Sequence, residues 1–273
     1  IYAVRPGDTL YSVAKKYSVD LSRLAAVNQL ADPSRLAVGS ALVIPGYAEG
    51  ALRPAEVNGY AYPHISAAVL NATLPYLTFF CPFSYSMTAD GALIPIDDRP
   101  LVFSAYAANT APMMTVTNIG STGGFSGDIA HAVFMDEAVQ NRVLDNILST
   151  LREKKYYGIN FNIEYVYPFD REGYNAFIRR AADVFHPLGY YLSTAIAPKE
   201  SDAQGGLLYE AHDYAAHGRY MDRVVIMTYE WGYTYGAPQA VSPVDRMRSV
   251  LAYAVTKMPA GKILMGFSNY GYS

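Results

Sequence analysis

Short apolar runs alternate with helical patterns from residue 55 onward, which predicts a parallel β-sheet with helices between its strands. Seven runs have the length and composition of strands: residues 56–62, 77–87, 113–118, 158–165, 191–197, 224–230 and 263–271. Apolar residues recur at helical spacing in residues 136–154, 170–185 and 244–256. Right-handed crossovers would curl such a series into an α/β fold, a (β/α)₈ barrel of the TIM type.

The predicted barrel is one strand short of closure. Its seventh strand ends at residue 271, directly before Ser273, whereas a TIM-type barrel has eight strands. A barrel that lacks one strand has two unpaired edges and an open core. We therefore expect the sequence to be a fragment or an incomplete gene product rather than a finished domain.

Residues 1–46 carry a separate pattern of strand, helix, helix and strand. After the first short strand, Asp8 or Thr9 is placed to cap a helix whose apolar residues recur at helical spacing. A second helix is predicted at residues 21–28 and a closing strand at residues 41–44. The pattern therefore predicts a small βααβ domain.

A linker joins the two patterns. Residues 47–54 are rich in Gly, Ala and Pro, which is typical of connecting segments. The chain is thus predicted to consist of a small domain, residues 1–46, and a barrel, residues 55–273. The hydrophobic fraction of 51% is ample for a sizeable core in a chain of 273 residues.

The charge balance limits the class of partner. The formal net charge is −3 and no long charged run occurs, which argues against nucleic acid or an anionic membrane. No run of about 18 apolar residues is present, so we expect no membrane span. The 25 tyrosines offer flat faces that suit sugar rings, although half-buried barrel positions would explain most of them. A neutral polymer such as a glycan fits this composition.

Other chemistries find little support in the sequence. Cys81 is the single cysteine and lies in an apolar run, so we expect a buried thiol and no intrachain disulfide. His212 and His217 are five residues apart, off the spacing that puts two metal ligands on one helix face, and are interpreted as hydrogen-bonded structural histidines. Residues 120–127 match neither a P-loop nor a nucleophile elbow and are interpreted as a loop. We expect neither a metal nor a cofactor.

The most informative strand covers residues 157–165. Its polar positions, Gly158, Asn160, Asn162 and Glu164, alternate with apolar residues and therefore share one face. Helical segments flank the strand in the sequence, so a face turned to water is not expected. Two amides and a carboxylate that point into a barrel indicate a functional site.

This strand resembles the catalytic strand of glycoside hydrolase family 18, written Asp-Gly-x-Asp-x-Asp-x-Glu. Glu164 falls on the catalytic acid, and Tyr157, Asn160 and Asn162 fall on the three family aspartates. Further runs are similar to the spore-cortex-lytic, LysM-bearing branch of the family: residues 167–175, 193–199, 209–214 and 227–233. In that branch Tyr and Asn are expected at the first two aspartate positions, so Asn162 is the departure from the pattern.

The resemblance implies substrate-assisted hydrolysis. Glu164 would protonate the glycosidic oxygen while the 2-acetamido carbonyl of the substrate attacks the anomeric carbon, so no second protein carboxylate is needed. This role requires a raised pKa, which desolvation by apolar surroundings would supply for Glu164. Asn162 would accept the acetamide N–H without offering a full negative charge. The alternative is a structural Glu164 bonded to neighbouring Tyr or amide groups.

The run at residues 227–231 matches a second family 18 motif. The resemblance implies that Tyr229 hydrogen-bonds the acetamide carbonyl and that Glu230, which replaces the usual Asp, binds sugar hydroxyls. Trp231 would stack on a sugar ring, with core packing as the alternative. Together with residues at predicted strand ends, the candidates for substrate binding are Asn160, Met227, Glu230, Trp231, Tyr85 and Tyr270.

Residues 1–46 resemble a LysM module over their whole length. The match rests on Gly-Asp-Thr-Leu at 7–10, Asn28, and the closing pattern at 36–45. LysM modules bind N-acetylglucosamine polymers in a shallow groove, mostly through backbone groups. The resemblance implies a groove lined by Gly7, Asp8, Thr9, Leu10, Leu30, Ala31 and Asp32. For Asp8 and Thr9, a turn and a helix cap explain the residues equally well.

These features favour a glycosidase, similar to N-acetylglucosaminidases and chitinases, that cleaves bacterial peptidoglycan or spore cortex fragments. We expect a monomer that acts outside the cytoplasm, at the cell wall or the spore coat and cortex, with peptidoglycan or another N-acetylglucosamine polymer as its partner. The alternative is a catalytically silent protein that binds peptidoglycan or chitin. Glu164 favours the enzyme, whereas Asn162 favours the alternative.

Overall fold

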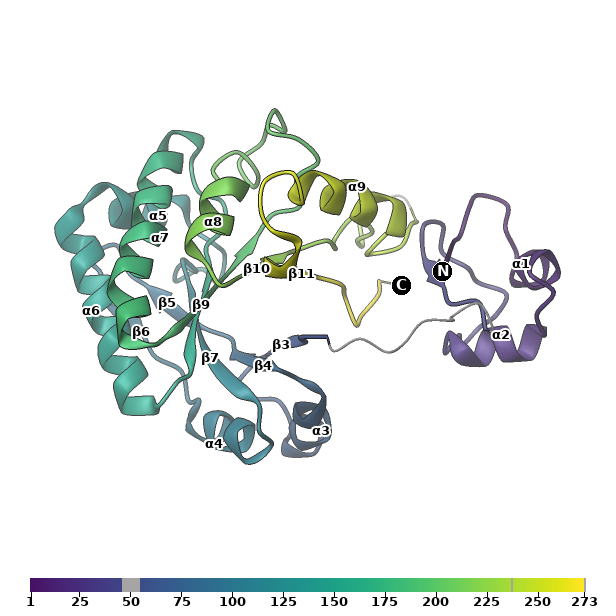
Figure 1. Cartoon of the computed structure of the whole chain (residues 1–273), viewed down its shortest axis with the longest axis horizontal. Coiled ribbons are helices and arrows are strands. Elements are labelled where there is room, and N and C mark those ends of the chain that lie inside the picture. Colours follow the sequence, from purple (N-terminus) through teal and green to yellow (C-terminus); the bar gives the residue numbers. More distant parts are fainter. Residues whose placement is uncertain (46–54, 237, 273) are drawn as a thin grey trace. The chain divides into compact units, whose positions relative to one another are not determined.

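The computed structural model describes residues 1–45, 55–236 and 238–272, so the predicted linker at residues 47–54 lies outside the described residues. The chain forms two compact units (Figure 1). Unit 1 comprises Ile1–Pro54, Thr228–Ala252 and Gly266–Ser273, and unit 2 comprises Ala55–Met227 and Tyr253–Met265. The proposed boundaries between the small domain, the linker and the barrel stay a prediction.

Seven parallel strands form the continuous path of a nine-stranded sheet in unit 2, in the order β11-β10-β9-β8-β7-β4-β3, so strands that follow one another in this series are neighbours. Their bounds are β3 Asn58–Ala61, β4 Phe79–Pro82, β7 Ala111–Thr117, β8 Gly158–Asn162, β9 Tyr191–Ile196, β10 Arg223–Ile226 and β11 Ile263–Met265. Each overlaps one of the predicted strand runs, although β7 begins two residues and β10 one residue before the predicted start, and the predicted TIM-type fold is confirmed.

The second predicted strand is wrong in extent, because residues 77–87 form two strands. β4 ends at Pro82, which cannot donate a hydrogen bond to a neighbouring strand. The chain pairs with β7 again as β5 (Tyr85–Met87), and four residues, 81–84, lie opposite three, 113–115. β5 then forms a hairpin with β6 (Leu93–Ile94), which the sequence pattern did not predict.

Side chains from distant strands show that the sheet is curled. Tyr60 of β3 donates from its hydroxyl to Oδ1 of Asn160 in β8, at 3.0 Å, although two strands lie between them in the sheet. Arg223 of β10 binds Glu56, directly before β3, through two hydrogen bonds of 2.5 and 2.7 Å. A flat sheet would hold these residues far apart, since neighbouring strands are ~4.8 Å apart.

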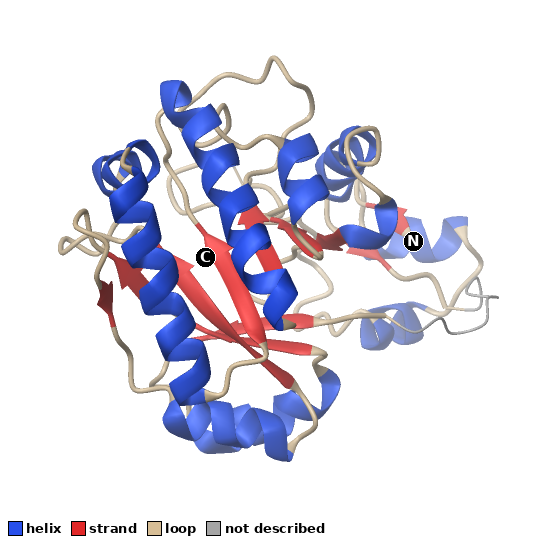
Figure 2. Ribbon diagram, turned by 60° about the vertical axis from the view of Figure 1, so that its left-hand side comes forward, coloured by secondary structure: helices blue, strands red, loops and turns tan. Residues whose placement is uncertain are grey.

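Helices cover the strands of unit 2 (Figure 2). They are α3 Ala67–Thr73, α4 Arg99–Ala107, α5 Gly127–Met135, α6 Glu137–Lys154, α7 Arg171–Phe185 and α8 Tyr214–Tyr220, and the last helix of the chain is α9 Val244–Ala254. The three predicted helices are present. In α6, Asp136 caps the first turn, and the predicted apolar stripe is buried at Val139, Val143, Ile147 and Leu151. None of the described helices has the length and hydropathy of a membrane span.

The amino-terminal residues form the predicted βααβ arrangement. β1 (Tyr2–Ala3) pairs antiparallel with β2 (Ala41–Leu42), and α1 (Leu10–Lys16) and α2 (Leu21–Val27) lie between them in the chain. Thr9 caps α1 in a capping box with Ser12, so the predicted cap is confirmed. These residues have a core of their own: Tyr2, Val4, Leu10, Val13, Ala14, Leu24, Leu42 and Ile44.

Candidate active site

Glu164 lies two residues beyond the carboxyl end of β8, the end at which TIM-type barrels carry their active sites. Its side chain is half-buried, and desolvation raises its pKa to about 7. At this pKa a large fraction of Glu164 holds its proton near neutral pH, as a general acid must. Before it in the chain, β8 is buried throughout, including Asn160 and Asn162.

The side chain of Asn118 holds the backbone of Glu164 on both sides. Oδ1 of Asn118 accepts from the amide N of Glu164 at 3.0 Å, and Nδ2 of Asn118 donates to the carbonyl O of Glu164 at 2.7 Å. Nδ2 also donates to the carbonyl of Ser126, at 2.9 Å. Asn118 follows the end of β7 and is fully buried. Asn118 was not among the predicted site residues, although a polar side chain at the end of a predicted barrel strand is the signal that marks it.

His212 fixes the residue that precedes Glu164. Its Nδ1 accepts from the amide of Ala197 at 2.9 Å, so the other ring nitrogen, Nε2, carries the proton and donates to the carbonyl of Ile163 at 3.0 Å. Burial lowers the pKa of His212 to about 4, so the ring is neutral at physiological pH. The prediction of a hydrogen-bonded structural histidine is confirmed here, and its link to the Glu164 segment was not foreseen.

His217 corrects the same prediction for the second histidine. Both of its ring nitrogens are buried and have no hydrogen-bond partner among the described residues. The ring packs edge-on against Tyr174, with 4.9 Å between ring centroids, and burial lowers the pKa of His217 to about 3. Cys81 is buried, as predicted. The described residues contain no group of three His, Cys, Asp or Glu side chains that could hold a metal ion.

The two amides of β8 have different surroundings. Both polar groups of Asn160 are engaged, since Oδ1 accepts from Tyr60 and Nδ2 donates to Oγ of Ser193 at 2.8 Å. Oδ1 of Asn162 is buried and accepts no hydrogen bond from any described residue. A buried carbonyl oxygen of this kind can accept a hydrogen bond from a ligand. Of the two amides, Asn162 therefore has the free acceptor.

Tyr85 is buried inside the protein. Its side chain is 1% exposed, and its hydroxyl donates to Asp98 at 2.5 Å. Asp98 also accepts from Tyr156 and Lys154, each at 2.6 Å, so the four side chains form a buried structural cluster. This burial corrects the prediction that Tyr85 contacts substrate, because a strand end in the pattern gave no information on which way its side chain points.

The predicted residues after β10 divide between the two units. Met227, which is buried, is the last residue of the first segment of unit 2, whereas Tyr229, Glu230 and Trp231 belong to unit 1. Within unit 1, Glu230 accepts hydrogen bonds from Tyr270 and, at 2.8 Å, from Tyr272. Tyr229 and Trp231 are half-buried, and Trp231 donates from its backbone to Val241. Glu230 and Tyr270 are thus brought together, and their predicted roles in binding stay predictions.

Comparison with protein families assigns both parts of the chain. Residues 103–273 match the model for glycosyl hydrolases family 18, and residues 2–45 match the model for the LysM domain. The chain belongs to glycosyl hydrolase family 18. The matched segment includes β8 with Glu164, the position on which the sequence resemblance was based.

The chain is similar to named bacterial proteins over most of its length. A "cortical fragment-lytic enzyme" of Bacillus subtilis is 41% identical over 325 residues, which cover 100% of this chain and 75% of that protein. The crystal structure of the spore cortex-lytic enzyme SleL of Bacillus cereus is similar with a TM-score of 0.76 and 40% identity, over 97% of this chain and 62% of that one. A chitinase of Chromobacterium violaceum has a TM-score of 0.72 and 26% identity, over 78% of this chain and 68% of that one. The chain thus spans less than two thirds of the SleL structure.

The LysM residues divide into exposed and internally bonded groups. Asp8 accepts from Tyr2 and from the backbone of Arg5, each at 2.7 Å, and the bond from Tyr2 lowers the pKa of Asp8. Asp32 accepts from Ser34, and the side chain of Leu10 is buried. Gly7 and Ala31 are exposed, and Leu30 is half-buried. These contacts favour a structural role for the Asp8 side chain, and the predicted groove stays a prediction.

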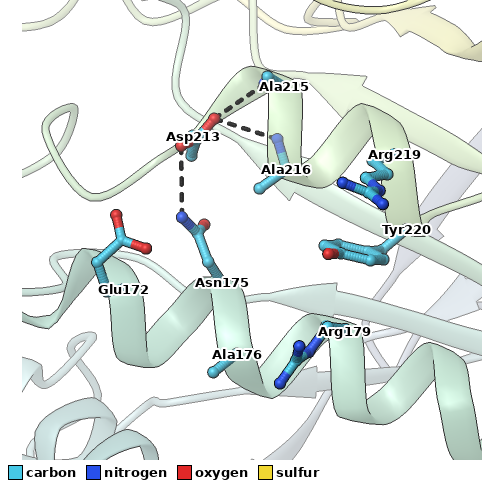
Figure 3. A pocket seen from close by; sticks show the side chains of 9 residues that line it. All are labelled: Glu172, Asn175, Ala176, Arg179, Asp213, Ala215, Ala216, Arg219 and Tyr220. Atoms are coloured by element: carbon cyan, nitrogen blue, oxygen red, sulfur yellow. Dashed lines mark hydrogen bonds between the residues drawn. The ribbon is translucent and has the colours of Figure 1, made fainter.

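A cavity of about 450 Å³ on the outside of the barrel contains none of the predicted site residues. It lies between α7 and α8, where Asp213 caps α8 and binds Asn175 (Figure 3). Glu172 lines one part of this cavity, and Arg179 and Arg219 line another. Because Glu164 is absent from its lining, this cavity is distinct from the candidate active site.

Proposed function

We propose that this family 18 protein hydrolyses N-acetylglucosaminyl bonds in fragments of bacterial peptidoglycan, including spore cortex. The observation that carries the proposal is Glu164 at the carboxyl end of β8, with desolvation raising its pKa to about 7. The names of the Bacillus relatives, a cortical fragment-lytic enzyme and a spore cortex-lytic enzyme, support the choice of substrate.

In the proposed reaction Glu164 donates its proton to the glycosidic oxygen as the bond to the anomeric carbon breaks. The acetamide carbonyl oxygen of the same sugar attacks that carbon, which gives an oxazolinium ion and retains a covalent bond at the anomeric centre. The Glu164 carboxylate then takes a proton from the water that opens this ion, so the configuration is retained overall. Glu164 is thus protonated again at the end of the reaction.

Two further residues would align the attacking group. The buried Oδ1 of Asn162 accepts the acetamide N–H, a role that its lack of a partner among the described residues supports. The family motif assigns to Tyr229 a hydrogen bond to the acetamide carbonyl. Asn118 and His212 contribute indirectly, because they hold the backbone from which the Glu164 side chain projects.

The LysM domain would tether the enzyme to its polymer. We infer that it binds N-acetylglucosamine units of the cell wall or spore cortex, and that the protein acts there, outside the cytoplasm. Its own hydrophobic core supports a role as an independent binding module. A shallow groove that binds through backbone groups suits a repeating polymer, because many positions along the chain are equivalent.

One observation favours a second function, that of a catalytically silent glycan-binding protein. Asn162 stands where the family pattern has an acidic residue, so it provides no full charge to stabilise the oxazolinium ion. Such a protein would bind the polymer through its LysM domain and its barrel without cleaving it.

Release of reducing ends from soluble cortex fragments, measured beside a pull-down on insoluble peptidoglycan, separates the two functions. The enzyme is expected to release reducing ends, and Glu164→Gln should abolish release while leaving the pull-down unchanged. Asp128→Asn, at an exposed acid on α5, is a matched control that should retain activity. Binding without any release by the unaltered chain would establish the silent function.

A further inference from the structure

A second cavity, of about 640 Å³, lies at the opposite end of the barrel from Glu164. Its lining includes residues at or just before the starts of the strands: Glu56 before β3, Phe79 in β4, Tyr157 before β8, Tyr191 in β9 and Arg223 in β10. The strands are parallel and Glu164 follows the carboxyl end of β8, so the two sites are at opposite ends of the sheet. The volume falls within the ~300–1,000 Å³ of small-molecule sites.

Three aromatic rings form one wall of this cavity. Phe79 and Tyr191 are stacked, with 5.0 Å between ring centroids and 25° between ring planes. Tyr157 extends the wall, since its ring centroid is 5.8 Å from that of Tyr191. Phe79 is buried, whereas Tyr157 is 47% exposed. The wall therefore has a fixed base and one ring that a ligand can reach.

The polar part of the lining is an ion pair in which the charges of Glu56 and Arg223 neutralise each other. Glu56 and Arg223 share two hydrogen bonds, and their side chains keep 37% and 24% of their exposure. The Arg223 guanidinium lies 5.9 Å from the centroid of the Tyr191 ring. A charged ligand would meet a like charge in this pair, whereas hydroxyl groups can donate to the carboxylate and accept from the guanidinium.

We propose that this cavity is a second carbohydrate site, which binds an N-acetylhexosamine unit of a glycan with the sugar ring on Tyr157 and its hydroxyls on Glu56 and Arg223. An aromatic face beside a neutral pair of donor and acceptor groups suits a neutral polyhydroxylated ring. The choice of this sugar rests on the proposed function. A glycan held here is fixed to the barrel at a place remote from Glu164.

Titration of the full chain with tri-N-acetylchitotriose, followed by amide chemical shifts, tests the proposal. All proteins carry Glu164→Gln, so that the probe is not cleaved. Saturable shifts are expected at Phe79 and Tyr191, and Tyr157→Ala should weaken binding at these amides about fivefold or more, as loss of a stacking ring does. Tyr157→Phe, which keeps the ring, should change the dissociation constant at these amides less than about twofold. Phe103→Ala changes an exposed aromatic residue on α4 that does not line the cavity, so it should leave the dissociation constant unchanged.

Two outcomes would overturn the proposal. One is the absence of saturable shifts at Phe79 and Tyr191. The other is a Tyr157→Ala variant that reaches half-saturation at the same ligand concentration as the protein with Tyr157. A thermal unfolding curve would confirm that this variant is folded. The proposed function is tested separately, by the release of reducing ends from cortex fragments by the unaltered chain. Failure of hydrolysis with intact shifts at the cavity would therefore leave the second site standing.

Discussion

The surroundings of the Glu164 side chain change its acidity. Its pKa is raised from 4.5 to about 7 because partial burial disfavours the carboxylate. The same shift has a consequence for stability, since the unfolded chain releases this proton at a lower pH than the folded protein. Between these two values the folded state binds more protons, so the stability that the site contributes falls as pH rises from about 4.5 to 7.

Glu164→Gln should therefore stabilise the protein at alkaline pH. Gln does not titrate, so the gain appears as pH rises through this window and is complete above pH 7, where it reaches on the order of 3 kcal/mol. Free energies of unfolding from urea curves at pH 4 and pH 8 would measure it. An equal effect of the substitution at both pH values would show that the pKa of Glu164 is not raised.

At Asn162, restoring the family acid should raise turnover. Asn162→Asp supplies the negative charge that stabilises the oxazolinium ion, and one such electrostatic group is worth about 3 kcal/mol, or about a hundredfold in rate. If the proposed function holds, kcat on soluble fragments should rise toward that limit, with KM changed little because the side-chain oxygen of Asn162 can already accept the acetamide N–H. Unchanged or lower kcat would show that the protein stabilises the intermediate in another way.

At the scale of secondary-structure elements, the sequence pattern located every strand of the seven-strand series, because buried strands have a short apolar signature. It failed where one apolar run holds two strands, since the break after Pro82 depends on the register against β7. The site shows the same limit. The resemblance gave Glu164 and Asn162, whereas Asn118 and His212 act through contacts with residues 46 to 49 positions away in the sequence, which no local pattern reveals.

Asn118→Ala tests the support that the end of β7 gives to the end of β8. The substitution removes three hydrogen bonds and leaves the backbone groups of Glu164 and Ser126 unpaired, so the free energy of unfolding should fall by about 2–4 kcal/mol. If the proposed function holds, kcat should fall more than KM rises, because Glu164 loses its position. Asn146→Ala, which removes one bond from an exposed side chain to Gly91, is the control. Equal loss of kcat in both variants would exclude a positioning role for Asn118.

At the scale of the whole molecule, the amino-terminal domain is held together by its own contacts. Its core of eight buried residues draws only on the first 44 positions, and Asn28 joins α2 to the closing segment by two hydrogen bonds with Val43, of 2.7 and 2.9 Å. The sequence pattern predicted its βααβ order, since the residues of this core are close in sequence, whereas the backbone hydrogen bonds that Val38 accepts from Ala240 and Gly39 accepts from Val244 follow from no local pattern. The relation between the two units follows from no pattern in the sequence.

Residues 1–46 alone should therefore fold and bind insoluble peptidoglycan weakly. We expect the bound fraction to change little between low and high salt, because a groove for neutral sugars owes little to ion pairs that salt screens. A pull-down over a range of salt concentrations, with circular dichroism to confirm folding, provides the measurement. Loss of binding at raised salt would point to an electrostatic surface instead of the predicted groove.

The ion pair between Glu56 and Arg223 joins residues that are 167 positions apart in the chain. At ribosomal rates of about 5–20 residues per second, Glu56 is made roughly 10–30 s before its partner exists. During synthesis, the first strand of the barrel therefore lacks this ion pair until the sixth strand has been made. Closing a loop of 167 residues costs chain entropy, so we expect this contact to form after the folding transition state, and Glu56→Gln should then speed unfolding and leave the refolding rate nearly unchanged in stopped-flow experiments. A slower refolding rate would instead place the meeting of these two strands early, before the rest of the sheet is assembled.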